Sequence, residues 1–262
     1  MNASPDIPYP HLNALLSLMR QAGELALHQR STLRVESKVD HSPVTNADRA
    51  CERILVEGLT QLFPNDAILG EEGARSSPRG ATHTWYIDPI DGTRAYIDGL
   101  GHWGPTIART GPAGLEAGLF FEPSLGTMWV AAHGLGAWRG SQQLRPRTLE
   151  KFHGEVLFVP SGFHRVGPLA WPGRSRGLGS TAAHLAHVAS GGAAAALVHT
   201  WSPWDVGCGL LLLTEAGRTA RTLAGDPIID LSAGSQPFIA GDPGAVDLLL
   251  RATRTLLPSS GK

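Results

Sequence analysis

Residues 85–93 have the sequence WYIDPIDGT, and this stretch decides the fold. Aromatic and β-branched residues at its start favour a strand, and the glycine near its end favours a sharp turn. Pro89 offers no N–H group for ladder pairing, so Asp88 and Asp91 are expected to project together from a strand end. Two carboxylates about 4 Å apart repel each other by about 4 kcal/mol at an effective dielectric constant of about 20. The pair therefore indicates a bound hard cation or a shared proton, with a solvated acidic turn as the alternative.

Two other segments place acidic residues where they could complete a metal site. Residues 67–69 are expected to form a short buried strand, and Glu71 follows that strand closely. Ser202 is predicted to cap an apolar helix whose first helical residue is a proline, so Asp205 falls in the first turn. Taken singly, Glu71 could be a solvated charge and Asp205 a partner of the helix dipole. Only together with residues 85–93 do these acids predict a metal centre.

The hydrophobic periodicity predicts helices first, then a sheet, then alternating strands and helices. Residues 12–26 and 47–62 carry apolar side chains at helical spacing. Short β-rich runs between residues 67 and 139, separated by glycine and proline, predict an antiparallel sheet. Residues 74–82 and the two termini show the weakest hydrophobic periodicity, so we expect them to be the least structured parts of the chain.

The same pattern predicts two parts of the chain. Residues 1–149 are expected to form an α+β half that carries most of the metal ligands. Residues 150–262 are expected to form an α/β half that contributes Asp205 and substrate contacts, and it ends in a helix over residues 243–257 capped by Asp242.

Composition predicts a cytoplasmic protein and excludes several classes of function. The chain has 262 residues, a formal net charge of −1 and 42% hydrophobic residues, so it can bury a large core but has no cationic field for nucleic acid. No apolar run is long enough to span a membrane, and residues 1–10 lack the apolar core of a signal peptide. Cys51 and Cys208 fall on apolar helix faces, where we expect reduced core thiols.

Competing motifs fit less well. The haloacid-dehalogenase pattern has its two acids one residue closer together, and an EF-hand loop needs an oxygen ligand where Ile90 stands. His184 and His187 share a predicted helix, but without Cys or acidic companions nearby we expect a surface or core role and no zinc site. Serine-hydrolase and zincin motifs do not occur in the sequence.

Four motifs in order carry a family resemblance. They are Val44–Asp48 with Lys38 upstream, Gly70–Glu72, Asp88–Thr93 and Trp204–Asp205. Together they resemble the inositol monophosphatase family of metal-dependent phosphomonoesterases. The resemblance implies a fold on the border of α+β and α/β, namely a layered αβαβα sandwich of the inositol monophosphatase and fructose-1,6-bisphosphatase type. It also implies a homodimer and inhibition by Li⁺.

The resemblance further implies a set of metal ligands. Glu71, Asp88 and the backbone carbonyl of Ile90 would hold one Mg²⁺ ion, and Asp88 would bridge to a second ion held with Asp91 and Asp205. A third ion near Glu71 is also implied. Hard oxygen ligands of this kind suit Mg²⁺.

Catalytic and phosphate-binding residues are implied in the same way. Thr93, oriented by Asp48, would position the attacking water, with Glu71 as the third catalytic residue. The amides of Gly92 and Thr93 would bind the phosphate group at the start of the following helix. Lys38 would be an outer-shell cation near the phosphate.

The substrate is the least constrained inference, and it is expected to be a small phosphorylated metabolite. The run Asp91–Tyr96 is similar to the histidinol-phosphate phosphatase branch of the family. Inositol phosphatases carry a glutamate for sugar hydroxyls seven residues before the acid that matches Asp205, and that position here is Val198. Histidinol phosphate is therefore favoured, and inositol phosphate comes next.

Recognition of the histidinol ammonium group stays open. Residues 197–201 contain no acid, and Arg94 would repel an ammonium unless its guanidinium faces the phosphate or points away. Asp98, Glu122 and an acid from a partner subunit are the remaining candidates.

Two alternatives to this function also stay open. One is a regulatory protein that binds metal and phosphate without turnover, although all the catalytic acids are present. The other is a phosphatase of the same family that acts on a sugar bisphosphate or a nucleotide 3′-phosphate.

Overall fold

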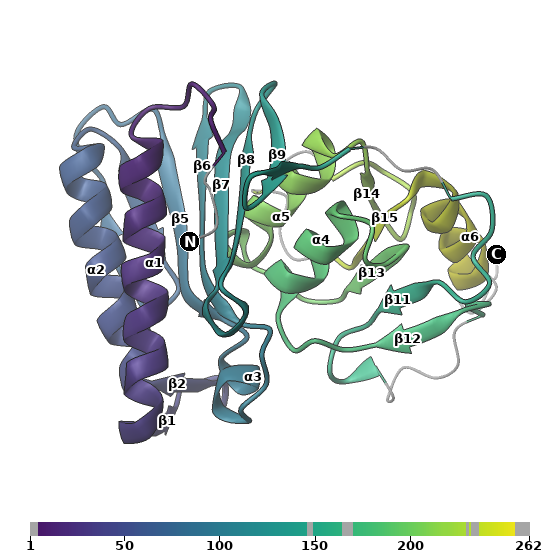
Figure 1. Cartoon of the computed structure of the whole chain (residues 1–262), viewed down its shortest axis with the longest axis horizontal. Coiled ribbons are helices and arrows are strands. Elements are labelled where there is room, and N and C mark those ends of the chain that lie inside the picture. Colours follow the sequence, from purple (N-terminus) through teal and green to yellow (C-terminus); the bar gives the residue numbers. More distant parts are fainter. Residues whose placement is uncertain (1–4, 146–148, 164–169, 229–230, 232–235, 255–262) are drawn as a thin grey trace, which may run out of the picture.

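Two β-sheets and three groups of helices stack in five layers, in the order helix, sheet, helix, sheet, helix (Figure 1). The computed structural model describes residues 5–145, 149–163, 170–228, 231 and 236–254. The layers confirm the expected αβαβα architecture. The last strand of the first sheet ends at Gln143 and the second sheet begins at Val156, so the expected boundary at residues 149 and 150 falls between the two sheets.

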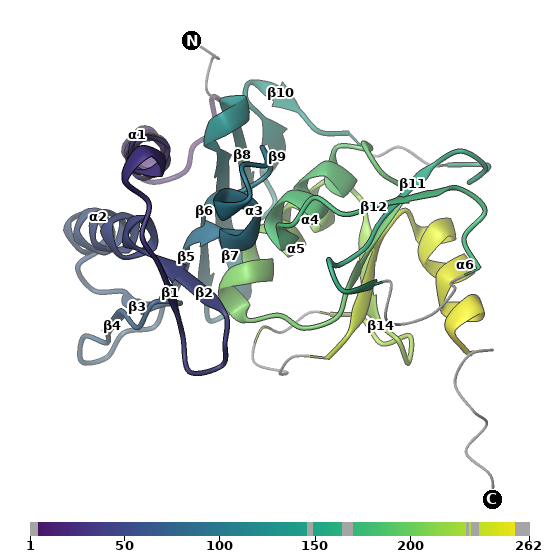
Figure 2. The ribbon, with the colours of Figure 1, turned by 90° about the horizontal axis from the view of Figure 1, so that it is seen from below.

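The outer helical layer consists of α1 (Leu12–Gln29) and α2 (Asn46–Leu62), which pack side by side against the first sheet (Figure 2). Their buried residues recur at helical spacing, as the sequence predicts. A 3-10 turn, η1 (Arg30–Thr32), and a short antiparallel ribbon of β1 (Val35–Ser37) and β2 (Pro43–Thr45) connect the two helices.

The first sheet has eight strands in the order β10-β9-β8-β7-β6-β5-β3-β4. They are β3 (Ala67–Gly70), β4 (Arg75–Ser76), β5 (Thr84–Asp91), β6 (Gly104–Gly111), β7 (Gly114–Glu122), β8 (Thr127–Ala132), β9 (Gly136–Arg139) and β10 (Gln142–Gln143). The short helix α3 (Thr93–Ile97) joins β5 to β6, and the 3-10 turn η2 (Pro123–Leu125) joins β7 to β8.

The prediction of an antiparallel sheet is wrong at one position, because β3 pairs in parallel with β5. After β3 the chain returns along β4, antiparallel to β3, and so enters β5 from the same end as β3. Residues 74–82, expected to be the least structured, therefore include β4. The parallel register places Gly70 opposite Ile87, so Glu71, the first residue after β3, lies next to Asp88 of β5.

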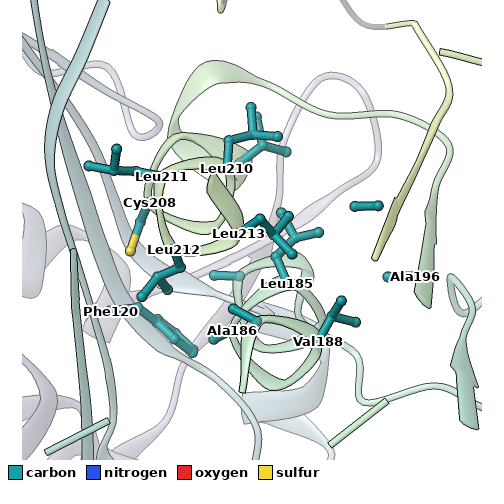
Figure 3. Packing of buried hydrophobic residues seen from close by; sticks show 14 of the residues in the cluster. Phe120, Leu185, Ala186, Val188, Ala196, Cys208, Leu210, Leu211, Leu212 and Leu213 are labelled. Carbon is teal, nitrogen blue, oxygen red and sulfur yellow. The ribbon is translucent and has the colours of Figure 1, made fainter. Parts of the chain in front are cut away.

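The middle layer consists of α4 (Thr181–Ala189) and α5 (Pro203–Glu215). Every residue from Val206 to Leu213 is buried, as expected for a helix enclosed between two sheets. Figure 3 shows leucines of α5 packed against Leu185 of α4 and against Phe120 of β7. Gly118 of β7 allows close approach: a Cβ atom there would lie 2.7 Å from the Cα atom of Cys208.

The second sheet has the order β12-β11-β13-β15-β14 and is mixed, with the first three strands parallel. The strands are β11 (Val156–Phe158), β12 (Arg174–Arg176), β13 (Ala195–Val198), β14 (Thr219–Thr222) and β15 (Phe238–Gly241). The helix α6 (Pro243–Arg254) forms the fifth layer, and Asp242 accepts a hydrogen bond from the Gly244 amide at its start. Residues 255–257 of the predicted last helix lie outside the described residues.

Both cysteines are free and buried, as expected for core thiols. Burial raises the pKa of Cys51 to about 12, so this thiol is unreactive at neutral pH. Within the described part of the chain, no helix is both long and apolar enough to cross a membrane.

We predict that Gly118→Ala destabilises the protein by about 1–3 kcal/mol, since the added methyl group would clash with the backbone of α5 and push that helix from the sheet. Urea unfolding measures the change. Gly101→Ala is the control, because a Cβ atom at Gly101 meets only an ordinary contact at 3.8 Å. Equal stability of the two variants would contradict the tight α5–β7 contact.

Candidate active site

Asp88 and Asp91 lie at the end of β5, where its pairing with β6 shifts register. Asp88 pairs with Thr106 and Asp91 with Gly104, so β5 has one extra residue between them. A bulge of this kind re-aims side chains. The amide of Ile90 donates a 2.8 Å hydrogen bond to Oδ1 of Asp88, which fixes that carboxylate. The proline at position 89 thus interrupts pairing without ending the strand.

Asp205 joins these two acids from the other half of the chain. Carboxylate oxygens of Asp88, Asp91 and Asp205 all lie within 4.8 Å of one another. Asp205 stands in the first turn of α5, where the Ser202 amide donates a 2.6 Å hydrogen bond to its Oδ2. The three acids predicted to bind metal are therefore together, two from the end of β5 and one from the start of α5.

The start of α4 holds Asp91 in place. Its Oδ2 accepts hydrogen bonds from the Ser180 hydroxyl and, at 2.8 Å, from the Ala182 amide. Gly92 has a left-handed backbone with φ of 88°, and a Cβ atom there would lie 2.9 Å from Cβ of Ser180. Only glycine fits at this turn.

Glu71 lies beside the three aspartates because of the parallel pairing of β3 with β5. Its amide donates to the Ile87 carbonyl at 3.0 Å. Its carboxylate accepts a 2.8 Å bond from Nζ of Lys38, and the same ammonium lies 2.7 Å from Glu72. Lys38, expected near the phosphate, is thus paired with two glutamates of the site.

Thr93 and Asp48 are also brought together. The Thr93 hydroxyl lies 3.3 Å from Oδ1 of Asp48 and 3.1 Å from the carbonyl of Ile90. Asp48 is fully buried, and its Oδ2 accepts bonds from the amide and hydroxyl of Thr45 at 2.8 and 2.6 Å. One oxygen of Asp48 is therefore fixed by the cap of α2 while the other faces Thr93.

Burial raises the pKa of all three clustered aspartates, and their mutual repulsion adds to this effect. The pKa of Asp91 rises to about 7 and that of Asp205 to about 8, while that of Asp88 also rises well above its ordinary value. The cluster therefore favours a bound proton or cation over three free negative charges. The donors are all carboxylate and carbonyl oxygens, which fit a hard divalent cation such as Mg²⁺.

A cavity of about 190 Å³ opens beside Asp91, between α4 and the end of β13. Its polar lining includes Ser161, Thr181, His199 and Thr200, and Val198 also lines it. Among the residues that line this cavity, Asp91 is the one carboxylate.

His184 lines the same cavity, a position that was not predicted for it. Burial lowers the pKa of His184 to about 4, so the ring is neutral. Its Nε2 accepts a 2.9 Å bond from the Leu178 amide, which leaves Nδ1 as the N–H donor. The i, i+3 spacing of His184 and His187 does not predict that His184 lines a cavity, because this position depends on the loop before α4.

The remaining candidates for substrate recognition lie elsewhere. Arg94 and Asp98 are exposed on and after α3. Glu122 is fully buried and accepts a bond from Trp129, so it cannot reach a substrate. His187, expected to have no acidic companion, contacts Glu122.

The layered fold and a cluster of three aspartates that could hold a metal ion are the features to compare with known proteins. The model of the inositol monophosphatase family matches residues 10–255, and the chain belongs to this family of phosphoric monoester hydrolases.

Relatives within the family have more than one name. A histidinol-phosphatase of Chlorobaculum parvum is 35% identical over 219 residues, which are 79% of this chain and 84% of the relative. A protein of Pseudomonas aeruginosa named Nus factor SuhB is 31% identical over 97% of this chain and 99% of the relative. Among solved structures, an IMPase of Thermotoga maritima has a TM-score of 0.84 and 25% identity, and the match covers 95% of this chain and 98% of that one.

We predict that the chelated protein loses stability as pH rises. Asp91 and Asp205 bind protons more tightly when folded than in the unfolded chain, where the pKa is about 3.9. Their contribution is fully present below about pH 4 and is lost as pH rises through about 7 and 8. In EDTA, the melting temperature of the wild type relative to Asp205→Asn should fall between about pH 5 and pH 8.

Thermal melts across this pH range measure the difference. Saturating Mg²⁺ should abolish or reverse the decline, because the cation then takes the place of the protons. A wild type that gains stability over Asp205→Asn with rising pH in EDTA would show that the carboxylates are ionised in the folded, metal-free protein.

Proposed function

We propose that this protein is a Mg²⁺-dependent phosphomonoesterase whose substrate is histidinol phosphate. The observation that carries the reaction is the convergence of Asp88, Asp91 and Asp205 beside the Thr93–Asp48 pair. The observation that favours the substrate is the 35% identity to a histidinol-phosphatase.

The acidic residues hold the metal. Asp88, Asp91 and Asp205 form the core of this site, with Glu71 and the carbonyl of Ile90 beside them. Two Mg²⁺ ions, with a third near Glu71, would fit the number of oxygen donors. When bound, Mg²⁺ polarises phosphate oxygens and lowers the pKa of a coordinated water.

Thr93 and Asp48 prepare the attacking water. Asp48 can accept a hydrogen bond from the Thr93 hydroxyl, so the Thr93 oxygen can accept one from the attacking water. As the water attacks, its proton would pass to the Thr93 oxygen while the Thr93 proton passes to Asp48. Burial raises the pKa of Asp48, and the Thr45 bonds oppose this effect. The amides of the turn at Gly92 and Thr93 would bind the phosphate oxygens.

The cavity beside Asp91 would receive the rest of the ester. Its hydroxyl and imidazole groups can hydrogen-bond a small polar molecule, while Val198 offers no acceptor for the hydroxyls of inositol. No acid other than Asp91 lines the cavity, so the ammonium of histidinol phosphate would need an acid from a second subunit. We therefore propose a homodimer together with this substrate.

We predict a higher kcat/KM for histidinol phosphate than for inositol 1-phosphate in a phosphate-release assay. Unmet hydroxyls cost about 1–3 kcal/mol each. Val198→Glu should narrow the difference by adding an acceptor, whereas Val198→Met, similar in length, should not. Equal or faster turnover of inositol 1-phosphate by the wild type would contradict histidinol phosphate as the substrate. It would not contradict phosphatase activity.

We also predict that Asp88→Asn lowers turnover by several orders of magnitude without destabilising the chelated protein, because it removes charge repulsion along with a metal ligand. Mg²⁺ at a hundredfold excess over its dissociation constant should add about 2.7 kcal/mol of stability to the wild type and much less to the variant. Li⁺ should inhibit the reaction.

Asp226→Asn, which changes an exposed acid in the turn after β14, is the control for both effects. Full activity of the wild type in excess EDTA would rule out the metal mechanism. If phosphate is released only from sugar bisphosphates or nucleotide 3′-phosphates, the substrate instead belongs to one of those two classes.

A regulatory binding function is a second candidate, favoured by the match to Nus factor SuhB over 97% of this chain. That match leaves the partner open, and the formal net charge of −1 argues against a nucleic acid held by bulk electrostatics. Binding of Mg²⁺ and inorganic phosphate without turnover of any ester in the panel would support this candidate over the phosphatase.

A further inference from the structure

A second cluster of possible metal ligands lies away from the acidic site. It consists of His102 in the loop before β6, Glu122 at the end of β7 and His187 on α4, and we call it the His–Glu–His cluster. Nδ1 of His102 lies 2.8 Å from Oε1 of Glu122, and Nε2 of His187 lies 3.3 Å from each carboxylate oxygen. One ligand atom from each residue lies within 4.8 Å of the others.

Surrounding groups fix the orientation of all three side chains. Glu122 is fully buried, and Nε1 of Trp129 donates a 2.8 Å hydrogen bond to its Oε2. The ring of His187 packs edge-to-face against those of His102 and Trp129, each with centroids 5.1 Å apart. Outer hydrogen bonds and packed rings of this kind orient the ligands of protein metal sites.

The chemistry of the cluster differs from that of the acidic site. Two imidazoles and one carboxylate suit borderline divalent ions such as Zn²⁺, whereas a set of carboxylates suits Mg²⁺. Trp129 and His102 already provide one hydrogen-bond donor to each carboxylate oxygen of Glu122. Satisfying the hydrogen bonds of Glu122 therefore does not require His187. A second imidazole directed at both oxygens is explained by an ion that all three residues share.

We propose that His102, Glu122 and His187 bind one borderline divalent transition-metal ion, with Zn²⁺ as the ion to test. The His102 side chain is 31% exposed while Glu122 has no exposure, so a fourth position for water would open on the side of His102. This site is separate from the acidic site and does not rest on the proposed function.

A metal here would join three elements. His187 lies five residues after Ala182, about 7.5 Å along the axis of α4, and the Ala182 amide holds Asp91. The ion would therefore tie the last turn of α4 to β7 and to the loop before β6, and the first turn of the same helix holds Asp91 of the acidic site.

The test is Zn²⁺ binding by the whole protein in millimolar Mg²⁺, which competes with Zn²⁺ for carboxylate sites. Metal content after dialysis and the visible spectrum of the Co²⁺-substituted protein report the ion directly. We expect one Zn²⁺ per chain in the wild type, and at least about a tenfold loss of affinity in His102→Gln and in His187→Gln. His83→Gln is the matched control, because His83 pairs with Glu116 without a second histidine.

Two further variants keep the outcome clear. Asp205→Asn should bind Zn²⁺ like the wild type, which separates this site from the acidic one. Trp129→Phe removes only the outer hydrogen bond and should lower affinity by about tenfold while both histidines remain. Absence of stoichiometric Zn²⁺ in the wild type, or wild-type affinity in folded His102→Gln, would overturn the proposal.

Discussion

Three clustered carboxylates, two of them buried and the third partly buried, repel one another and set the main constraint on this structure. Asp88, Asp91 and Asp205 are held together by hydrogen bonds from Ile90, Ala182 and Ser202, whose amides lie in a strand bulge and in two helix starts. These backbone donors keep the acids in place although burial disfavours their charge. Holding these carboxylates together costs free energy without a cation and becomes favourable once one is bound. The backbone hydrogen bonds therefore hold the acids in a geometry that favours a bound cation.

The parallel pairing of β3 with β5 is the second condition for the site. It brings Glu71 next to Asp88, and Lys38 then balances part of the added charge. Burial works against the charged form of Lys38, but the bonds to Glu71 and Glu72 raise its pKa, so it stays an ammonium. The site thus contains its own cation next to the place where metal would bind.

Sequence reasoning succeeded where the determinants are local. Asp88 and Asp91 are placed by a strand, a proline and a glycine within nine residues, and Asp205 by a helix cap three residues away. It failed where distant segments meet. The parallel partner of β5 depends on the return through β4, and Glu122 lies 65 residues from His187 with no motif linking them. The lining of the cavity beside Asp91 likewise combines loops that no periodicity connects.

The enclosed helix α5 has a consequence for how the chain is made. It packs on β5, β6, β7 and β8 of the first sheet and on β14 of the second, yet it follows the whole first sheet in the sequence. During synthesis the inner face of that sheet therefore stays uncovered until residues 203–215 have left the ribosome. Exposed apolar sheet faces are prone to aggregation, so the nascent chain will depend on chaperones over this interval more than the finished protein does.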